Sequence, residues 1–185
     1  MTDIKQLISE LDLQKNISLD DIPNLDLYMD QVIQLFENTY KTTKRSEKDK
    51  ILTKTMINNY AKDKLLPPIQ NKKYTREHII FISLIYQLKG ALSINDIKAI
   101  LTSIHENEAI NIEQLYKKYL ELIADQSRGF VEDLEKRQLA IEATVENVSP
   151  DSQESAETLL LIASFVHMSS LYRRMAEKLV DQLEL

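Results

Sequence analysis

The scarcity of glycine is the feature that most constrains what this chain can fold into. Only Gly90 and Gly129 occur among 185 residues, and only four residues are proline. A phosphate-binding loop of either common type needs several glycines close together, so most nucleotide-binding enzymes are excluded. The small number of helix-breaking residues and the many Leu, Ile, Lys and Glu residues together predict a mainly α-helical protein.

The composition excludes further functional classes. There is no cysteine, so disulfides, thiolate zinc sites and cysteine nucleophiles are ruled out. His78, His105 and His167 are far apart in the sequence, which argues against a metal site. No nucleophile elbow with Ser, His and Asp partners can be drawn. We therefore expect a protein that is not an enzyme and that needs no cofactor.

The lack of targeting and membrane signals in the sequence indicates a cytoplasmic protein. The longest apolar runs lie within Ile79–Tyr86 and Leu159–Val166, and both are much shorter than the roughly 20 residues of a membrane span. The first residues lack the basic and then apolar pattern of a signal peptide. We expect a cytoplasmic protein that has no membrane partner.

Helical periodicity and chain breaks organise the N-terminal half. Apolar residues three and four apart predict helices over Thr2–Leu13, Leu25–Tyr40 and Thr53–Lys64. Thr53 or Thr55 is the candidate N-terminal cap of the third helix. The segment Lys41–Lys50 has no apolar residue and is typical of a mobile loop. The two prolines of Leu66-Pro67-Pro68 must end the third helix, and 69–74 is expected to form a small extended turn.

Capping residues mark four more helices. Thr75 begins a helix that ends at Gly90, and Ser93 begins the next. A longer helix follows Asn111, and the sequence leaves open whether Gly129 interrupts it before Val145. The pair Ser149-Pro150 begins the last helix, with proline in its favoured first-turn position.

The last helix carries apolar residues at heptad spacing. A second apolar row, Leu159, Ile162 and Val166, runs beside them. Two interpretations stay open: the core of a monomeric bundle, or the interface of a homodimer. The heptad positions, and hence the candidate dimer interface, are Leu161, Phe165, Met168, Tyr172, Met175 and Leu179.

Charge is distributed unevenly along the chain. Residues 41–78 contain eleven basic and four acidic side chains, whereas 1–40 contain two and eight, and 79–185 contain ten and seventeen. A basic centre between acidic arms is typical of a protein that binds a polyanion. A solvated helical surface without a partner explains a lone charge run equally well.

The residues from Leu52 to Leu101 resemble the DNA-binding domain of MerR-type transcription regulators. The resemblance rests on four segments: Thr55-Met-Ile-Asn-Asn-Tyr60, Leu65-Leu-Pro-Pro68, Lys73-Tyr74-Thr75 and Leu92-Ser-Ile-Asn-Asp-Ile-Lys98. With Ile22-Pro-Asn-Leu-Asp-Leu-Tyr-Met-Asp30, the chain also looks like a member of an uncharacterised family from Gram-positive bacteria.

This resemblance implies a fold and a division of the chain. Residues 1–106 would hold N-terminal helices and a winged helix-turn-helix domain, and 107–185 a C-terminal long-helix region for dimerisation or for an effector. The expected fold class is therefore mainly α. One departure is the loop Lys41–Lys50, which separates the two helices of the motif and leaves the geometry of the pair open.

The resemblance also implies a function and a set of contacts. An α-helix fits the major groove of DNA, where lysine pairs with guanine and asparagine with adenine. We expect a homodimer that binds double-stranded DNA and regulates transcription, with its wing on the phosphates; the alternative is a helical protein-interaction module that does not bind DNA. The candidate DNA-binding residues are Thr53, Lys54, Thr55, Asn58, Asn59, Lys72, Lys73, Tyr74 and Arg76.

An effector is a further open question. A small-molecule or protein effector of unknown identity is compatible with such a regulator. Four aromatic residues, Tyr116, Tyr119, Phe130 and Tyr172, are candidates to line its pocket, although aromatics at helical spacing more often belong to a core.

Overall fold

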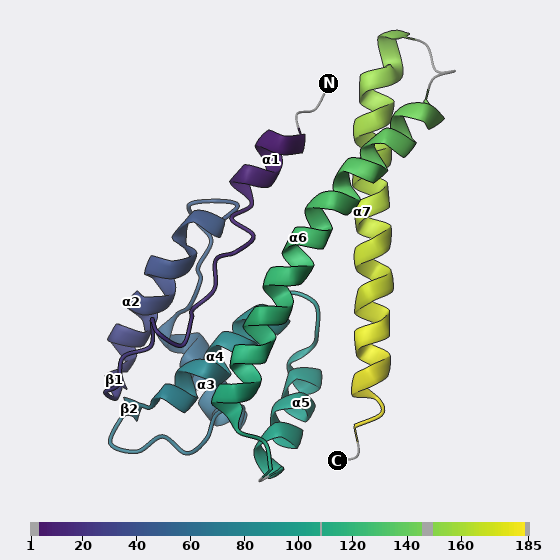
Figure 1. The fold of residues 1–185 in the computed structure, drawn as a ribbon. Coiled ribbons are helices and arrows are strands. Elements are labelled where there is room, and N and C mark those ends of the chain that lie inside the picture. The colour runs from purple at the N-terminus through teal and green to yellow at the C-terminus, as the bar shows by residue number, and fades with distance from the viewer. Residues whose placement is uncertain (1–3, 108, 146–149, 184–185) are drawn as a thin grey trace. The chain divides into compact units, whose positions relative to one another are not determined.

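The protein is mainly helical, as the composition predicts. The computed structural model describes residues 4–107, 109–145 and 150–183, and 68% of the structure is helix. The elements in chain order are α1 (Ile4–Glu10), β1 (Leu27–Tyr28), α2 (Met29–Tyr40), the 3-10 helix η1 (Lys41–Thr43), α3 (Lys54–Lys62), β2 (Lys73–Tyr74), α4 (Arg76–Leu88), α5 (Ile94–Glu106), α6 (Ile112–Thr144) and α7 (Pro150–Val180) (Figure 1).

The chain divides into two compact units. The first comprises Met1–Gln14 and Leu122–Met175, and the second comprises Lys15–Glu121 and Ala176–Leu185. The second unit therefore contains β1, β2 and α2 to α5, together with the first turns of α6 and the end of α7. The boundary expected between residues 106 and 107 falls inside this second unit.

Helix α4 forms the centre of the second unit. Its residues from His78 to Ile85 are all buried, so no face of this stretch is left for solvent. A helix that is apolar on every side must be covered by several neighbours, because each exposed face would leave apolar surface in water. The residues that pack in this core include Val32 and Phe36 of α2, Ile57 and Tyr60 of α3, Ile97 and Leu101 of α5, and Tyr116 of α6.

The predicted N-terminal caps are confirmed. Thr53 Oγ1 accepts a hydrogen bond from the Met56 N–H at 3.2 Å, and Thr75 and Ser93 cap α4 and α5 in the same way. Asn111 Oδ1 accepts from the Gln114 N–H at 3.0 Å at the start of α6. These bonds satisfy backbone donors that have no partner within the helix, so each helix begins where its cap stands.

The C-terminal helices resolve one question that the sequence left open and confirm one prediction. Helix α6 continues through Gly129 to Thr144, so this glycine does not interrupt it. Pro150 is the first residue of α7, in agreement with the prediction, while Ser149 lies outside the described residues. Both helices are longer than 30 residues: α6 has 33 and α7 has 31.

The helix predicted over Leu25–Tyr40 is wrong in its first four residues. Leu27 and Tyr28 instead form β1, which pairs antiparallel with β2 in the register Leu27↔Tyr74 and Tyr28↔Lys73 (Figure 1). Leu27 is buried and Tyr28 is 56% exposed, the alternation of a strand. The turn expected over 69–74 accordingly contains a strand. Helix α1 ends at Glu10 instead of the predicted Leu13, and Thr2 lies outside the described residues.

Two tyrosines of the second unit are buried with their hydroxyl groups in the core. The Tyr116 hydroxyl donates a hydrogen bond to the Ile17 carbonyl at 2.7 Å, and the Tyr40 hydroxyl accepts one from Gln87 Nε2 at 3.2 Å. Burial raises the pKa of Tyr40 to about 12 and also raises the pKa of Tyr116. The folded state therefore holds these protons at pH values where the unfolded chain releases them.

We expect the free energy of unfolding to fall as the pH rises from about 10 towards 12. The tyrosines of the unfolded chain ionise at their ordinary pKa, whereas the buried tyrosines of the folded state stay protonated in this range. Ionisation therefore favours the unfolded state, and the protein loses stability as the pH rises. Urea denaturation at several pH values measures the fall. Tyr40→Phe should make it shallower, whereas the control Tyr172→Phe, at a side chain 71% exposed, should leave it unchanged. Equal slopes for the two variants would contradict this account.

Candidate nucleic-acid interface

Helix α3 presents a continuous polar face to solvent. Ile57 and Tyr60 are buried in the core and fix which way the helix faces. The residues on the opposite side are exposed and contain no carboxylate. They are Lys54, Thr55, Asn58, Asn59 and Lys62.

Lys62 is the member of this face that sequence reasoning did not select. It lies four residues after Asn58, so helical spacing places it on the same side. That spacing was the available signal. The face thus offers two ammonium groups, two carboxamides and a hydroxyl over nearly the full length of α3.

Two of the predicted contacts at the start of α3 already have partners. The Thr53 hydroxyl is half-buried and caps the helix, so its role is structural. Lys54 Nζ lies 2.7 Å from Asp30 Oδ1 of α2, with side chains 64% and 75% exposed. An exposed ion pair of this kind contributes about 0–1 kcal/mol, so Lys54 can exchange it for a phosphate at little cost.

A tight turn precedes β2 and displays two polar residues. The Lys73 N–H donates to the Gln70 carbonyl at 2.9 Å, and Asn71 and Lys72 between them have φ values of 51° and 57°. Both are exposed at the tip of this turn, which we call the wing (residues 70–74). Positive φ at both central residues is the geometry of a two-residue hairpin turn.

The wing also carries an exposed aromatic ring. Lys73 Nζ lies 5.6 Å from the centroid of the Tyr28 ring on β1, the cross-strand neighbour in the register. Tyr28 is a residue that the sequence assigned to a helix face. Its position beside the wing depends on the pairing of β1 with β2, which no local pattern reveals.

Tyr74 and Arg76 are placed differently from the other candidates. Tyr74 is 3% exposed and belongs to the core, and burial raises its pKa. Arg76 Nη1 donates to the Ile22 carbonyl at 2.9 Å, and its Nε lies 3.1 Å from Glu113 Oε1. Both side chains therefore hold the second unit together and are not part of the candidate interface.

His78 connects the double-proline segment to the start of α4. Its Nδ1 lies 3.1 Å from the Thr75 N and 2.7 Å from the Thr75 Oγ1, and its Nε2 lies 3.2 Å from the Pro67 carbonyl oxygen. A ring that accepts at Nδ1 and donates at Nε2 satisfies both contacts. The wing begins and ends close to these anchors, so this buried imidazole helps to fix its position.

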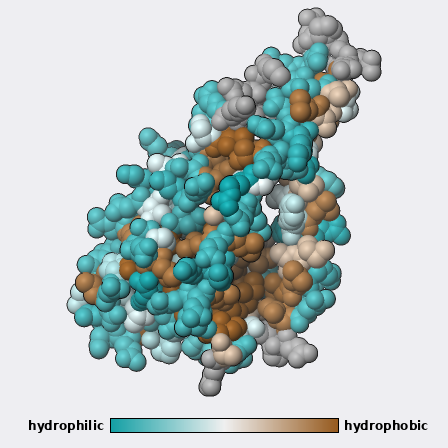
Figure 2. Space-filling model, viewed as in Figure 1, coloured by the Kyte–Doolittle hydropathy of each residue, from teal (hydrophilic) through white to brown (hydrophobic). Residues whose placement is uncertain are grey.

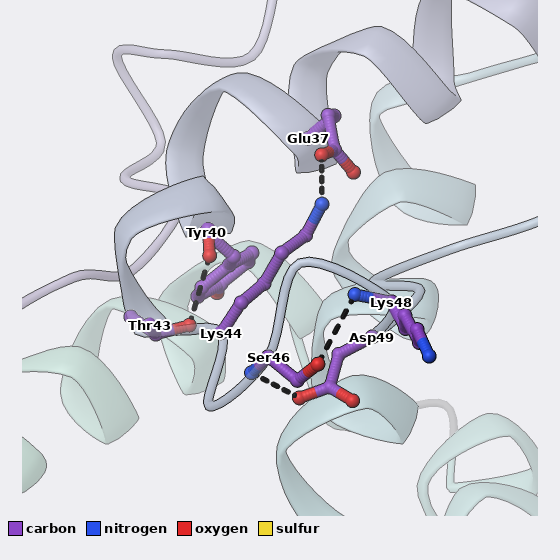
Figure 3. A network of polar contacts seen from close by, with 7 residues as sticks. All are labelled: Glu37, Tyr40, Thr43, Lys44, Ser46, Lys48 and Asp49. Carbon is purple, nitrogen blue, oxygen red and sulfur yellow. Dashed lines mark hydrogen bonds and ion pairs between the residues drawn. The ribbon is translucent and has the colours of Figure 1, made fainter.

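The segment expected to be a mobile loop is held by specific contacts. After η1, Lys44 pairs with the Glu37 carboxylate of α2, and Thr43 Oγ1 donates to the Tyr40 carbonyl at 2.9 Å (Figure 3). The Lys44 side chain is only 20% exposed. The loop is therefore attached to the end of α2 instead of being free.

A compact turn follows the attachment point. The Ser46 N–H donates to Asp49 Oδ2 at 2.9 Å, the Asp49 N–H donates to the Ser46 carbonyl at 2.9 Å, and the Lys48 N–H reaches Ser46 Oγ at 3.3 Å (Figure 3). The Asp49 carboxylate is thus used within the turn. We call residues 45–50, which contain this turn, the basic loop.

The candidate dimer residues on α7 fall into different environments. Leu161 is 8% exposed and packs in the small core of the first unit with Leu134 of α6, and Met168 is half-buried. The other four seam residues are between 36% and 71% exposed: Phe165, Tyr172, Met175 and Leu179.

The second apolar row on α7 is the more exposed one within the first unit. Leu159, Ile162 and Val166 are 65%, 55% and 61% exposed. Figure 2 shows hydrophobic side chains on the surface along this helix. Large apolar side chains gathered on one exposed face commonly mark an interaction surface.

The aromatic residues considered for an effector pocket belong to two different units. Tyr116 and Tyr119 are stacked with centroids 6.1 Å apart in the second unit, and Tyr116 is 1% exposed. Phe130 and Tyr172 belong to the first unit and are 40% and 71% exposed. Within each unit, then, these rings serve as core or as surface residues.

The chain belongs to the family of the domain of unknown function DUF1836. The family model matches residues 17–119, which nearly coincide with the continuous part of the second unit. No curated protein and no solved structure matches the chain. The candidate interface residues of α3, the wing and the basic loop all lie within the matched residues.

The described ranges contain neither a candidate metal cluster nor a membrane-spanning helix. In residues 4–107, 109–145 and 150–183, no three His, Asp or Glu side chains gather where they would hold a metal ion. None of the helices in these ranges is both long enough and apolar enough to cross a membrane.

We expect Lys72→Gly to stabilise the fold. Lys72 holds φ at 57°, which disfavours a residue with a Cβ atom and suits glycine. The free energy of unfolding should rise by about 0.5–1 kcal/mol in urea denaturation. Lys98→Gly, within α5, is the control and should destabilise by a similar amount. A loss of stability in Lys72→Gly would show that the ammonium group supports the turn.

Proposed function

We propose that the protein is a sequence-specific regulator of transcription that binds double-stranded DNA as a homodimer. The observation that carries this proposal is the exposed, carboxylate-free polar face of α3, backed by the buried Ile57 and Tyr60. The order of α2, α3 and wing supports a winged helix-turn-helix motif of the MerR type. The proposal assigns the protein no catalytic activity.

The side chains of α3 suit the major groove. Asparagine can pair with two atoms of adenine at once, and lysine donates to the acceptors of guanine. In the proposed complex, Asn58 and Asn59 read base edges, and Lys54 and Lys62 contact guanine or the flanking phosphates. Thr55 reaches a base or a phosphate from the same face.

The wing suits the DNA backbone. Lys72 stands at the tip of the turn and Lys73 beside it, and both can contact phosphates without reading sequence. Such contacts set the register of α3 on the duplex. The ring of Tyr28 beside Lys73 widens this contact surface.

We expect Asn58→Ala and Asn59→Ala to relax sequence preference. Each variant loses base contacts, so its binding free energy should weaken by about 1–3 kcal/mol on the preferred duplex and change little on a random one. The control is Asn95→Ala, at an exposed asparagine of α5 outside the interface. The preferred duplex is first selected from a random pool, and fluorescence anisotropy then measures binding of each variant.

The contrasting variant is the pair Lys72→Ala and Lys73→Ala. It should weaken binding to every duplex alike, because phosphate contacts carry no sequence information. Should the asparagine variants instead match Asn95→Ala, α3 is not the reading helix even if the protein binds DNA.

We further propose that α7 joins two copies of the chain through its exposed apolar residues. Glu157 lies near the start of α7 and Arg174 near its end. An antiparallel pair centred between Ile162 and Val166 places the acidic end of each helix level with the basic end of the other. Parallel pairing would align like charges, so the charge pattern favours the antiparallel dimer.

Ile162→Glu should convert the dimer into a monomer. A charge on the apolar row would lie unpaired in the interface, which costs several kcal/mol. Sedimentation velocity measures the oligomeric state, and far-UV circular dichroism checks that the helices are retained. The control is Leu139→Glu, at an apolar residue of α6 that is 66% exposed. A folded but still dimeric Ile162→Glu variant would exclude this surface.

The alternative function is a helical protein-interaction module that does not bind DNA. The exposed apolar residues of α7 and the net charge of −6 favour it. The two functions separate by their response to salt, because an apolar protein interface does not weaken steeply as salt rises, whereas DNA binding does.

A further inference from the structure

The basic loop contains three cations that the fold does not use. Arg45, Lys48 and Lys50 are exposed, and among the described residues no carboxylate lies within ion-pair distance of any of them. Lys44, by contrast, is committed to Glu37. Of the four cations in residues 44–50, Lys44 thus anchors the segment and the other three face solvent.

The two acidic residues of the loop offset only part of this charge, so residues 45–50 keep a net charge of +1. The Asp49 carboxylate accepts the Ser46 N–H inside the turn, and Glu47 is the only other acid between residues 45 and 50. Figure 3 shows Lys48 on the turn with its side chain directed away from the bond between Ser46 and Asp49. Three cations on a turn of fixed shape form a local positive field with a defined position.

The basic loop is close to the start of α3. Lys50 precedes Lys54 by four residues, so their Cα atoms are at most about 14 Å apart. This distance is comparable to the width of the major groove, about 12 Å. When a recognition helix enters the groove, the segment before it lies over the sugar-phosphate strand at the edge of the groove.

We propose that Arg45, Lys48 and Lys50 bind the phosphates of the duplex beside the groove that α3 enters. The basic loop is thus a second backbone contact, on the N-terminal side of the helix whose Asn58 and Asn59 read the groove. This inference rests on the proposed function. Its physical basis is that the attachment of Lys44 to Glu37 fixes the loop before binding, so less chain entropy is lost in the complex.

The first test replaces all three cations with glutamine, as Arg45→Gln, Lys48→Gln and Lys50→Gln together. Affinity should fall at least tenfold in 0.1 M salt, and the slope of log K against log salt should become shallower by about 2–3, since each neutralised phosphate contributes about 0.9. Sequence preference should not change. The matched control removes three exposed lysines elsewhere, with Lys98→Gln, Lys117→Gln and Lys136→Gln.

The results distinguish the two proposals from each other. If the wild-type protein binds no duplex, the proposed function fails and the loop inference fails with it. If the wild-type protein binds and the loop variant keeps its affinity and slope, or loses no more than the control, only the loop inference is overturned. Circular dichroism confirms that each variant is folded.

A second variant tests whether the loop must be held. Glu37→Gln breaks the attachment of Lys44 and also removes a negative charge. If the cations acted only through a diffuse field, losing this negative charge would tighten binding. The fixed loop predicts the opposite sign, a two- to fivefold loss of affinity. Unchanged or tighter binding would therefore overturn the inference.

Discussion

The burial of α4 is the constraint on which the rest of the second unit depends. Its central residues, from His78 to Ile85, can leave water only if α2, α3, α5 and the start of α6 cover every side. This requirement orients α3, because Ile57 and Tyr60 must face the core and the polar side must then face outward. The core therefore determines the proposed interface, because the side of α3 that is not buried in the core is the side exposed to solvent.

Local signals were sufficient to predict where α3, α4 and α5 begin. Thr53, Thr75 and Ser93 cap their own helices through bonds to residues three positions later, and such contacts are visible in the sequence. The pairing of β1 with β2 was not predictable in this way. It joins Leu27 to Tyr74 across nearly fifty residues. From the local sequence alone, the short strand at Leu27 was therefore predicted to be the beginning of a helix.

The same distinction applies to the interface. Helical spacing correctly indicated that Asn58 and Asn59 share the solvent side of α3, and it would also have found Lys62. It could not show that Arg76 is engaged by the Ile22 carbonyl and by Glu113, or that Lys44 anchors the loop to α2. Such partners come from other elements, so a count of basic residues overstates how many cations remain available for a ligand. In the structure, the cations of this region that remain available for a ligand are therefore those of the wing, α3 and the basic loop.

The most direct test of the central claim is fluorescence anisotropy of the wild-type protein with labelled duplexes from upstream of its own gene, across a series of salt concentrations. The account predicts saturable binding with a slope of log K against log salt near −5 or steeper, which corresponds to about six neutralised phosphates. No binding at low salt, to these duplexes or to a random pool, would contradict the account and leave the protein-interaction module as the better explanation of the fold.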